Sequence, residues 1–312
     1  DLVKYAADCG ADYVKFQTFV TENLVTEFAE KADYQKFNLK NEDSQFQMLK
    51  KLELPMNFYN ELISLATEEG IKFLSTSFDI ESSNFVNSLD LDYFKIPSGE
   101  ITNIPFIKHA ATFNKKIILS SGMSNLGEID LAISTLLNNG INRKNITLLH
   151  CTSSYPTPIE DVNLLVMNTL KNSFKLNVGY SDHTLSLSIP IAAAALGATI
   201  IEKHFTLNKS LPGPDHKASL EPKEFKKMVK AIREVDISLG NGLKSISDNE
   251  IKNMQVARKS IVAKVKINKG QILSEDNLTC KRPGIGLSPI FFEKIIGLKA
   301  KRSFEKDELI EL

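Results

Sequence analysis

The sequence predicts an α/β protein, a (β/α)8 TIM barrel that lacks its first strand in this chain, followed by a small β-rich C-terminal domain. Short apolar runs alternate with amphipathic segments through residues 1–242, and this alternation is typical of a parallel sheet. Polar side chains follow nearly every apolar run. That distribution favours a barrel over a doubly wound open sheet, in which polar groups gather at one switch point.

Seven apolar runs are expected to form strands, and four longer segments to form helices. The expected strands are residues 13–16, 73–75, 93–96, 117–120, 146–150, 176–180 and 199–204. The expected helices are residues 55–69, 128–138, 164–172 and 187–196. The chain opens inside a further helix that ends at Gly10, because glycine commonly terminates helices. We therefore expect the first barrel strand to precede residue 1.

Three domain-level features follow from the pattern. Residues 1–242 are expected to form the barrel, 243–255 a polar linker and 256–312 the small domain. Residues 263–273 and 300–310 resemble each other, which predicts two similar hairpin-like halves. The connection at residues 20–54 is long for a barrel loop, and long loops on the catalytic face are usually lids or binding loops.

Composition excludes several classes of function. Lysine plus arginine and aspartate plus glutamate number 38 each, and this balance argues against nucleic acid or an anionic membrane as the main partner. The longest nearly apolar run, residues 189–201, is too short to span a bilayer. The three cysteines are far apart and no signal peptide opens the chain. We expect a cytoplasmic protein without disulfides.

Two lysines at expected strand ends point to an anionic substrate. Lys15 and Gln17 share one face of their strand by the period of two. Lys95 ends another strand and is followed by Ser98 and Glu100. Lysine supplies charge and serine a hydrogen-bond donor to a phosphate or carboxylate, and Glu100 is a candidate base. The structural alternative is a solvated lysine or a rim salt bridge, which contributes little.

Further polar groups follow other strands. Ser120 precedes a helix with Asn125 and Glu128 at capping spacing, so the segment is either an anion site or an ordinary cap. Thr76 is a weaker candidate. Tyr155 stands in a proline-rich loop and offers an aromatic face suited to a sugar, although a structural tyrosine is the more common case.

His183 and His204 lie at the ends of neighbouring expected strands, and acidic residues surround them. Two imidazoles with open coordination positions suit a divalent metal that also holds water and substrate oxygen. Glu202 shares the strand face of His204 by the period of two. Asp215 is a candidate contact for a substrate hydroxyl, or alternatively caps the next turn. The whole set describes a phosphorylated acid and a metal, combined with a polyhydroxylated second substrate.

Several strings resemble the sialic acid synthase family across essentially the whole chain. They are residues 14–19, 95–100, 151–161, 180–184, 202–206 and 213–216. Residues 281–284 and their surroundings resemble that family's antifreeze-like SAF domain, a β-clip fold. The resemblance implies condensation of phosphoenolpyruvate with an N-acetylated mannosamine-type sugar, giving a nine-carbon 2-keto sugar acid and phosphate. N-acetylneuraminate is the first expected product, and N,N'-diacetyllegionaminate or pseudaminate the alternatives.

The resemblance also assigns roles to residues. Phosphoenolpyruvate contacts are implied for Lys15, Thr76, Lys95, Ser98, Ser120, Ser153 and Ser181. Acceptor-sugar contacts are implied for Gln17, Tyr155, Asp215 and Arg282. His183 and His204 are implied ligands of Mn²⁺ or Mg²⁺, and Glu100 and Glu202 are implied acid/base residues, with Lys15 and Lys95 counted among the catalytic groups. Arg282 is expected to reach the partner's barrel in a domain-swapped homodimer.

Two other functional hypotheses fit the sequence. A Schiff-base aldolase on the same barrel would use Lys95 or Lys203 as nucleophile and need no metal. A non-catalytic sugar-binding or ice-binding-like protein would use the small domain. The resemblance also places a site glutamate on the family's first strand, which is expected before residue 1.

Overall fold

The computed structural model describes residues 1–39 and 43–312, and the chain divides into two compact units. Unit 1 is Asp1–Gly240 and unit 2 is Asn241–Leu312. Each unit has hydrophobic clusters of its own.

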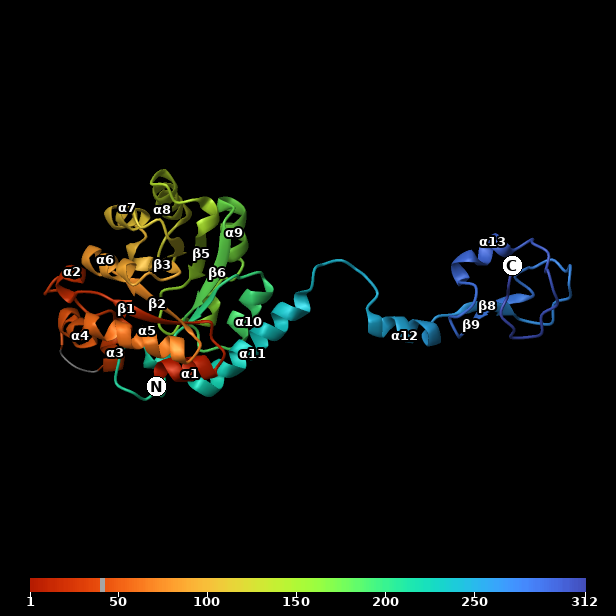
Figure 1. Ribbon diagram of the computed structural model, residues 1–312, viewed down its shortest axis with the longest axis horizontal. Coiled ribbons are helices and arrows are strands. Elements are labelled where there is room, and N and C mark those ends of the chain that lie inside the picture. The colour runs from red at the N-terminus through yellow and green to blue at the C-terminus, as the bar shows by residue number, and fades with distance from the viewer. Residues whose placement is uncertain (40–42) are drawn as a thin grey trace. The chain divides into compact units, whose positions relative to one another are not determined.

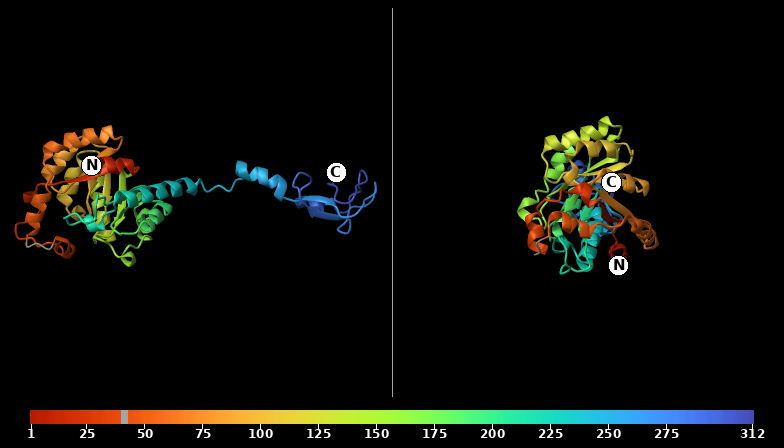
Figure 2. Two further views of the ribbon diagram at one scale, coloured as in Figure 1. Left: turned by 90° about the horizontal axis from the view of Figure 1, so that it is seen from below. Right: turned by 90° about the vertical axis from the view of Figure 1, so that its left-hand side faces the viewer.

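The core of unit 1 is a curled sheet of seven strands in sequential order, in which each neighbouring pair is parallel. The strands are β1 (Tyr13–Thr18), β2 (Lys72–Ser77), β3 (Tyr93–Ile96), β4 (Lys116–Ser120), β5 (Ile146–Cys151), β6 (Asn177–Asp182) and β7 (Ile201–Lys203). Figures 1 and 2 show the helices on the outer side of this sheet. The predicted strands and their parallel barrel-like arrangement are confirmed.

Strand β7 is shorter than the expected 199–204. The backbone oxygen of His204 accepts from the nitrogen of Leu220 at 2.9 Å, so the chain leaves the sheet at His204 to pair with the segment before α11 (Pro222–Leu239).

The helices of unit 1 follow the strands. Besides α11 they are α1 (Leu2–Asp8), α2 (Thr21–Leu24), α3 (Asp33–Leu39), α4 (Gln45–Leu52), α5 (Tyr59–Glu68), α6 (Ile80–Ser88), α7 (Ile104–Ala111), α8 (Leu126–Asn138), α9 (Val166–Phe174) and α10 (Ser188–Ala195). Short 3-10 helices are η1 (Met56–Phe58), η2 (Ser98–Glu100), η3 (Arg143–Asn145), η4 (Ile159–Asp161) and η5 (His216–Ala218). Asn125 and Glu128 form the capping box predicted for α8.

The two faces of the strands bury different clusters. Leu74, Ile118 and Leu149 pack together inside the curl of the sheet. The larger cluster lies between the strands and the outer helices and includes Phe94 and Leu119. Because side chains alternate along a strand, the inward positions beyond the inner apolar layer, toward the carboxyl ends, are the ones available to polar groups. The inward-facing polar side chains are therefore expected at one mouth of the curled sheet, at the carboxyl ends of its strands.

The long connection predicted at residues 20–54 contains α2, α3 and α4, and residues 40–42 within it lie outside the described part. Helix α4 begins at a capping box in which the Ser44 hydroxyl accepts from the Gln47 nitrogen. The connection is therefore built from short helices that pack on unit 1.

Unit 2 carries a two-stranded antiparallel sheet of β8 (Ser260–Ala263) and β9 (Leu278–Lys281). It also contains α12 (Asp248–Ala257), η6 (Pro289–Phe291) and α13 (Phe292–Ile295). The two sequence-related segments pair through Ile267 and Phe304, which exchange backbone hydrogen bonds of 2.9 and 2.8 Å. Helix α12 occupies most of the segment expected to be a linker, and a capping box of Ser247 and Glu250 begins it.

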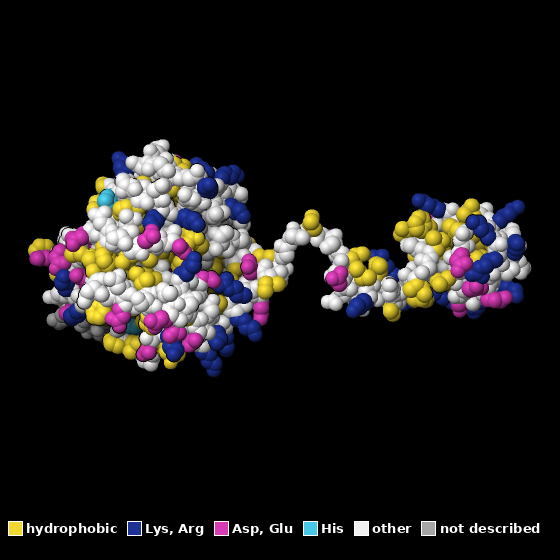
Figure 3. Space-filling view, viewed as in Figure 1, with side chains coloured by type: hydrophobic (Ala, Val, Ile, Leu, Met, Phe, Trp, Pro, Cys, Tyr) yellow, Lys and Arg dark blue, Asp and Glu magenta, His cyan; other side chains and the backbone are white. Residues whose placement is uncertain are grey.

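Acidic and basic side chains are both spread over the face of unit 1 shown in Figure 3, in keeping with the zero net charge of the sequence. Within residues 1–39 and 43–312, no helix combines the length and the apolar character needed to cross a membrane.

Candidate active site

The carboxylate of Glu202, on β7, is the centre of a charged cluster. Its Oε2 accepts from Lys95 Nζ, on β3, at 2.8 Å. Its Oε1 accepts from the Ser181 hydroxyl, on β6, at 3.0 Å and lies 4.0 Å from Lys15 Nζ, on β1. Four strands therefore contribute to one cluster, which carries a net positive charge of two lysines against one carboxylate.

Burial and the neighbouring charges together set the protonation of this cluster. The side chain of Lys95 is 2% exposed, while those of Lys15 and Glu202 are 22% and 21% exposed. Burial acts to raise the pKa of Glu202, but the charges of Lys15 and Lys95 outweigh it and hold that pKa below its ordinary value. Burial lowers the pKa of Lys15, against the attraction of Glu202. The cluster thus keeps an ionised carboxylate beside a lysine that benefits from a further anion.

A group of hydroxyls lies at the ends of neighbouring strands. The Oγ atoms of Ser98 and Ser153 are 3.3 Å apart. Gly122 packs so closely on them that an added Cβ would lie 2.3 Å from Ser98 Cβ and 2.7 Å from Ser153 Oγ. Ser120, at the end of β4, is buried. The turn before α8 therefore holds two hydroxyls against a backbone that only glycine permits.

Thr76 on β2 is buried inside the mouth, and its Oγ1 has no hydrogen-bond partner among the described residues. Its Cα is in register with Gln17 on one side and Lys95 on the other. Buried polar groups without partners are costly. A substrate oxygen would satisfy this hydroxyl, as the predicted role of Thr76 requires.

The two imidazoles lie against each other, with ring centroids of His183 and His204 5.4 Å apart. His183 Nδ1 lies 2.7 Å from the Thr152 carbonyl oxygen, so Nδ1 carries the proton and Nε2 has a free lone pair. Tyr155 covers both rings, with centroids 4.3 Å from His183 and 5.6 Å from His204. Burial lowers the pKa of His183, and burial together with His183 and Lys15 lowers the pKa of His204 to about 3.

Neutral imidazoles with free lone pairs fit a divalent metal ion. Among the described residues, no group of three or more His, Cys, Asp or Glu side chains is arranged to hold a metal. The pair therefore offers two ligands and leaves the other coordination positions to water and substrate, which suits Mn²⁺ or Mg²⁺ bound with a substrate oxygen.

Behind the imidazoles, Lys203 and Asp182 form a buried ion pair. Lys203 Nζ lies 2.6 Å from Asp182 Oδ2, and the two side chains are 1% and 0% exposed. The other carboxylate oxygen accepts from Tyr180 Oη and the Thr184 nitrogen. This network joins the carboxyl ends of β6 and β7, which carry the two histidines. It also occupies the Lys203 amine, which disfavours Lys203 as a Schiff-base nucleophile.

Asp215 completes the side of the mouth next to His204. Its Oδ2 lies 3.8 Å from His204 Nδ1, and its Oδ1 is shielded from solvent without a partner among the described residues. Burial raises the pKa of Asp215 to about 6, against the effect of Lys15. Tyr34, on α3, lies over Tyr155 with ring centroids 5.2 Å apart.

Comparisons with known proteins decide the family. The NeuB family model matches residues 2–244, and the SAF domain model matches residues 258–311. The chain belongs to the NeuB family. Its predicted membership of the sialic acid synthases is confirmed, and these are enzymes.

Two curated relatives of this NeuB-family chain are N,N'-diacetyllegionaminic acid synthases. The protein of Campylobacter jejuni subsp. jejuni serotype O:2 is 53% identical over 309 residues, which cover 99% of this chain and 92% of the relative. That of Legionella pneumophila is 46% identical over 300 residues, covering 95% and 84%. Human N-acetylneuraminate-9-phosphate synthase is 34% identical over 314 residues, covering 99% and 86%.

Among solved structures, the sialic acid synthetase from Leptospira borgpetersenii serovar Hardjo-bovis, in complex with citrate, has a TM-score of 0.70 at 30% identity. The match covers 81% of this chain and 83% of that one.

Three of the predicted site residues of this NeuB-family chain lie apart from the contacts described above. Gln17 is exposed on the strand face of Lys15. Glu100, in η2, accepts from Asn103 Nδ2 at 2.7 Å, and burial raises its pKa. Arg282 belongs to unit 2, where its Nε donates to the Ala257 oxygen at 2.9 Å. Their roles stay predictions.

Sequence reasoning did not single out Tyr34 or Gly122 as parts of the site. It considered Lys203 only as a Schiff-base nucleophile and did not predict that it pairs with Asp182. Asp182 stood next to His183 and Lys203 next to His204, so their position at strand ends was a usable signal. Gly122 followed two serines after a strand, which is a weaker signal. Tyr34 gave none, because it reaches the site through the docking of a distant helix.

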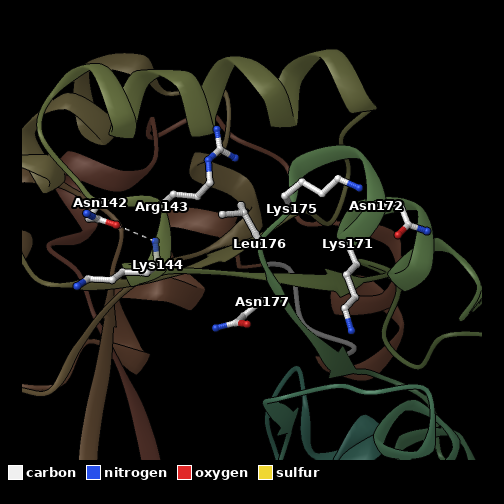
Figure 4. Close-up of a pocket in the computed structure, with 8 residues that line it drawn as sticks. All are labelled: Asn142, Arg143, Lys144, Lys171, Asn172, Lys175, Leu176 and Asn177. Atoms are coloured by element: carbon white, nitrogen blue, oxygen red, sulfur yellow. Dashed lines mark hydrogen bonds between the residues drawn. The ribbon is translucent and has the colours of Figure 1, made fainter.

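A second hollow lies at the opposite, amino-terminal end of β5 and β6. It is lined by Asn142, Arg143, Lys144, Lys171, Asn172, Lys175, Leu176 and Asn177. Figure 4 shows that its four cationic side chains point in different directions, and Arg143 Nη1 donates to the Phe174 oxygen at 2.5 Å. The hollow therefore does not present its charges to a single ligand.

Proposed function

We propose that this enzyme condenses phosphoenolpyruvate with an open-chain N-acylated mannosamine-type sugar, giving a nine-carbon 2-keto sugar acid and phosphate. One observation carries the proposal: Glu202 gathers Lys15, Lys95 and Ser181 directly beside the imidazole pair. An anion site that adjoins a carbonyl-activating site is what this bimolecular reaction requires, because it holds both reactants in one orientation.

The lysines and hydroxyls are assigned to phosphoenolpyruvate. Lys15 and Lys95 offset the charges of its phosphate and carboxylate. Ser98, Ser120, Ser153, Ser181 and Thr76 supply hydrogen-bond donors around the same space. The unpartnered Oγ1 of Thr76 and the closely packed serines beside Gly122 support this assignment.

The condensation forms a bond between C3 of phosphoenolpyruvate and the aldehyde carbon, and it breaks the C2–O bond to phosphate. The double-bond electrons of phosphoenolpyruvate form a carbon–carbon bond from C3 to the aldehyde carbon, and the aldehyde oxygen takes a proton. The cationic C2 adds water, whose proton passes to a base. The C2–O bond to phosphate then breaks, phosphate leaves with the bridging oxygen, and the added water oxygen becomes the ketone. Ionised Glu202 stabilises the developing positive charge and is the candidate base, with Glu100 the second candidate.

His183 and His204 are the residues that would hold Mn²⁺ or Mg²⁺. When bound, the ion supplies Lewis-acid polarisation of the aldehyde and a template for its oxygen. The hydrogen bond from His183 Nδ1 to Thr152 orients the ring and leaves Nε2 as the nitrogen that would bind the ion. Tyr155 packs on both rings and holds them in place.

Tyr155, Asp215 and Gln17 are assigned to the acceptor sugar, with Arg282 contributed by the partner subunit of a domain-swapped homodimer. The two relatives that are N,N'-diacetyllegionaminic acid synthases support an acceptor with two acetamido groups. Removing the three carbons of phosphoenolpyruvate from a nine-carbon product leaves a six-carbon aldose. We therefore propose a diacetamido hexose as the preferred acceptor, ahead of N-acetylmannosamine. A cytoplasmic location, where both substrates would be available, is part of the same proposal.

The test is phosphate release and product mass with the natural full-length protein. Phosphoenolpyruvate is combined with N-acetylmannosamine or with a mannose-configured diacetamido hexose, in the presence of Mn²⁺. We expect acceptor-dependent phosphate release, fastest with the diacetamido sugar. Absence of release with every acylated mannosamine would overturn the proposal.

A further inference from the structure

Helix α3 is docked on the segment that carries Asp215. Asn38 Nδ2 donates to the Pro214 oxygen at 2.7 Å. Lys217 Nζ lies 4.9 Å from the centroid of the Phe37 ring. These contacts flank Asp215 on both sides, so they fix α3 to one wall of the acceptor subsite.

Tyr34 extends from this docked helix over Tyr155. The two rings are tilted by 33° with centroids 5.2 Å apart. Gln35 Nε2 donates to the Tyr34 oxygen at 3.3 Å, so the Tyr34 hydroxyl keeps its own proton for another acceptor. Tyr34 is partly exposed and belongs to none of the hydrophobic clusters of unit 1.

Tyr155 links Tyr34 to the two imidazoles through ring contacts. The centroid of the Tyr155 ring lies 4.3 Å from that of His183 and 5.2 Å from that of Tyr34. We take the sugar chain to run along Tyr155 from the imidazoles, which would place the carbons distant from the aldehyde toward Tyr34. An N-acyl group suits this wall, because its methyl packs on an aromatic face and its amide oxygen accepts from a hydroxyl.

We propose that Tyr34 is a specificity-determining residue of the acceptor subsite, and that with Tyr155 it binds the second N-acyl substituent of a diacylated amino sugar. The inference rests on the proposed function. It implies that a sugar with a single N-acyl group near the aldehyde makes less use of Tyr34.

The experiment compares two acceptors in the full-length enzyme and its variants. Tyr34→Ala is expected to lower kcat/KM for the diacetamido hexose about 10-fold, the size expected for one apolar contact in a specific pocket. The value for N-acetylmannosamine should fall by less than about 3-fold, and the KM for phosphoenolpyruvate should not change. Tyr34→Phe, which keeps the ring, should lie between Tyr34→Ala and the parent.

Phe28→Ala is the matched control. Phe28 lies in the same connection, is 92% exposed and has no ring contact among the described residues. If Tyr34→Ala unfolds at a lower temperature than the parent, Tyr34→Leu repeats the test with the apolar volume kept.

Three outcomes decide the inference. A selective loss with the diacetamido sugar supports it. Equal behaviour of Tyr34→Ala and Phe28→Ala in an active enzyme overturns it and leaves the proposed function intact. A parent enzyme that releases no phosphate with any acceptor overturns the proposed function and this inference together.

Discussion

Lys95 Nζ on β3 lies 2.8 Å from Glu202 Oε2 on β7, so an ion pair joins strands that are four positions apart in the sheet. In a flat sheet these strands would be separated by about 19 Å, four times the usual spacing. The pair therefore depends on the curl of the sheet. It brings a positive and a negative group from distant parts of the chain into direct contact.

Replacement of Glu202 separates its catalytic role from charge balance. Glu202→Gln removes the only carboxylate that contacts Lys15 and Lys95 among the described residues. We expect kcat to fall at least about 100-fold, as is typical for the loss of a group acting in proton transfer. Binding of phosphoenolpyruvate should be unchanged or tighter, because two lysines then lack a counter-charge. Turnover and phosphoenolpyruvate titration measure the two effects.

The same variant should destabilise the fold by about 3 kcal/mol, because it leaves the nearly inaccessible Lys95 without its partner. The matched control is Glu30→Gln. Glu30 also pairs with a lysine, Lys36, at 2.7 Å, but its side chain is 83% exposed, so the expected change in unfolding free energy is much smaller than for Glu202→Gln. Equal losses of unfolding free energy in the two variants, measured with urea, would show that the buried Lys95–Glu202 pair stabilises the fold no more than an exposed pair.

Gly122 provides a test of the hydroxyl subsite. In Gly122→Ala the new methyl group would overlap Ser98 Cβ at 2.3 Å and Ser153 Oγ at 2.7 Å. We expect the KM for phosphoenolpyruvate to rise at least about 10-fold, because the two serines must move apart. Gly140→Ala is the control, since Gly140 also has a positive φ of +96° but would bring its Cβ near no other atom. If both variants raise that KM alike, the serines do not form the subsite.

The sequence allowed the strands and most site residues to be predicted because both follow local rules. Alternation placed Lys15 and Gln17 on one face of β1, and polar residues after apolar runs marked the mouth. The direction in which a side chain points could not be predicted in the same way. Glu100 follows Lys95 closely in sequence, but its carboxylate accepts from Asn103, and no local pattern specifies that choice.

Contacts made by docking could not be predicted. Tyr34 reaches Tyr155 because α3 packs against the loop of Asp215, and this depends on the whole connection between β1 and β2. Helix α12 was predictable in principle, since Ser247 and Glu250 have capping-box spacing, but its polar composition suggested a linker. In unit 2, Ile267 and Phe304 were expected to be equivalent positions, and the structure shows that they also pair with each other.

His204 predicts a specific dependence of stability on pH. An unfolded histidine titrates near pH 6.5, and burial with His183 and Lys15 lowers the pKa of His204 to about 3 in the folded chain. Between these values the unfolded state binds the additional proton. Stability of the metal-free protein is therefore full above pH 6.5 and falls as the pH falls, by about 2 kcal/mol at pH 5.

Urea unfolding at pH 7.5 and pH 5 measures this effect in the parent and in His204→Ala, both with EDTA. The loss of stability on acidification should be smaller in the variant. Identical losses would show that His204 is not held neutral by the fold.

Metal binding can be measured without turnover. We expect His204→Ala and His183→Ala each to weaken Mn²⁺ binding at least about 10-fold, since changes outside the ligand shell already reach that size. The control is His109→Ala, whose ring on α7 contacts Asn84 and Phe113. Free Mn²⁺ measured by electron paramagnetic resonance reports the affinity. If both site variants bind Mn²⁺ with the affinity of the parent, these histidines are not its ligands.

We propose that Lys15, Lys95, Glu202 and the imidazole pair form one site for an enol phosphate and an aldehyde. The most direct test of this proposal uses phosphoenolpyruvate labelled with ¹⁸O at the bridging oxygen between C2 and phosphorus, together with the diacetamido hexose and Mn²⁺. We expect the label to appear in the released phosphate, with one nine-carbon product formed for each phosphate. Phosphate released without the label, or released equally well without the sugar, would contradict it.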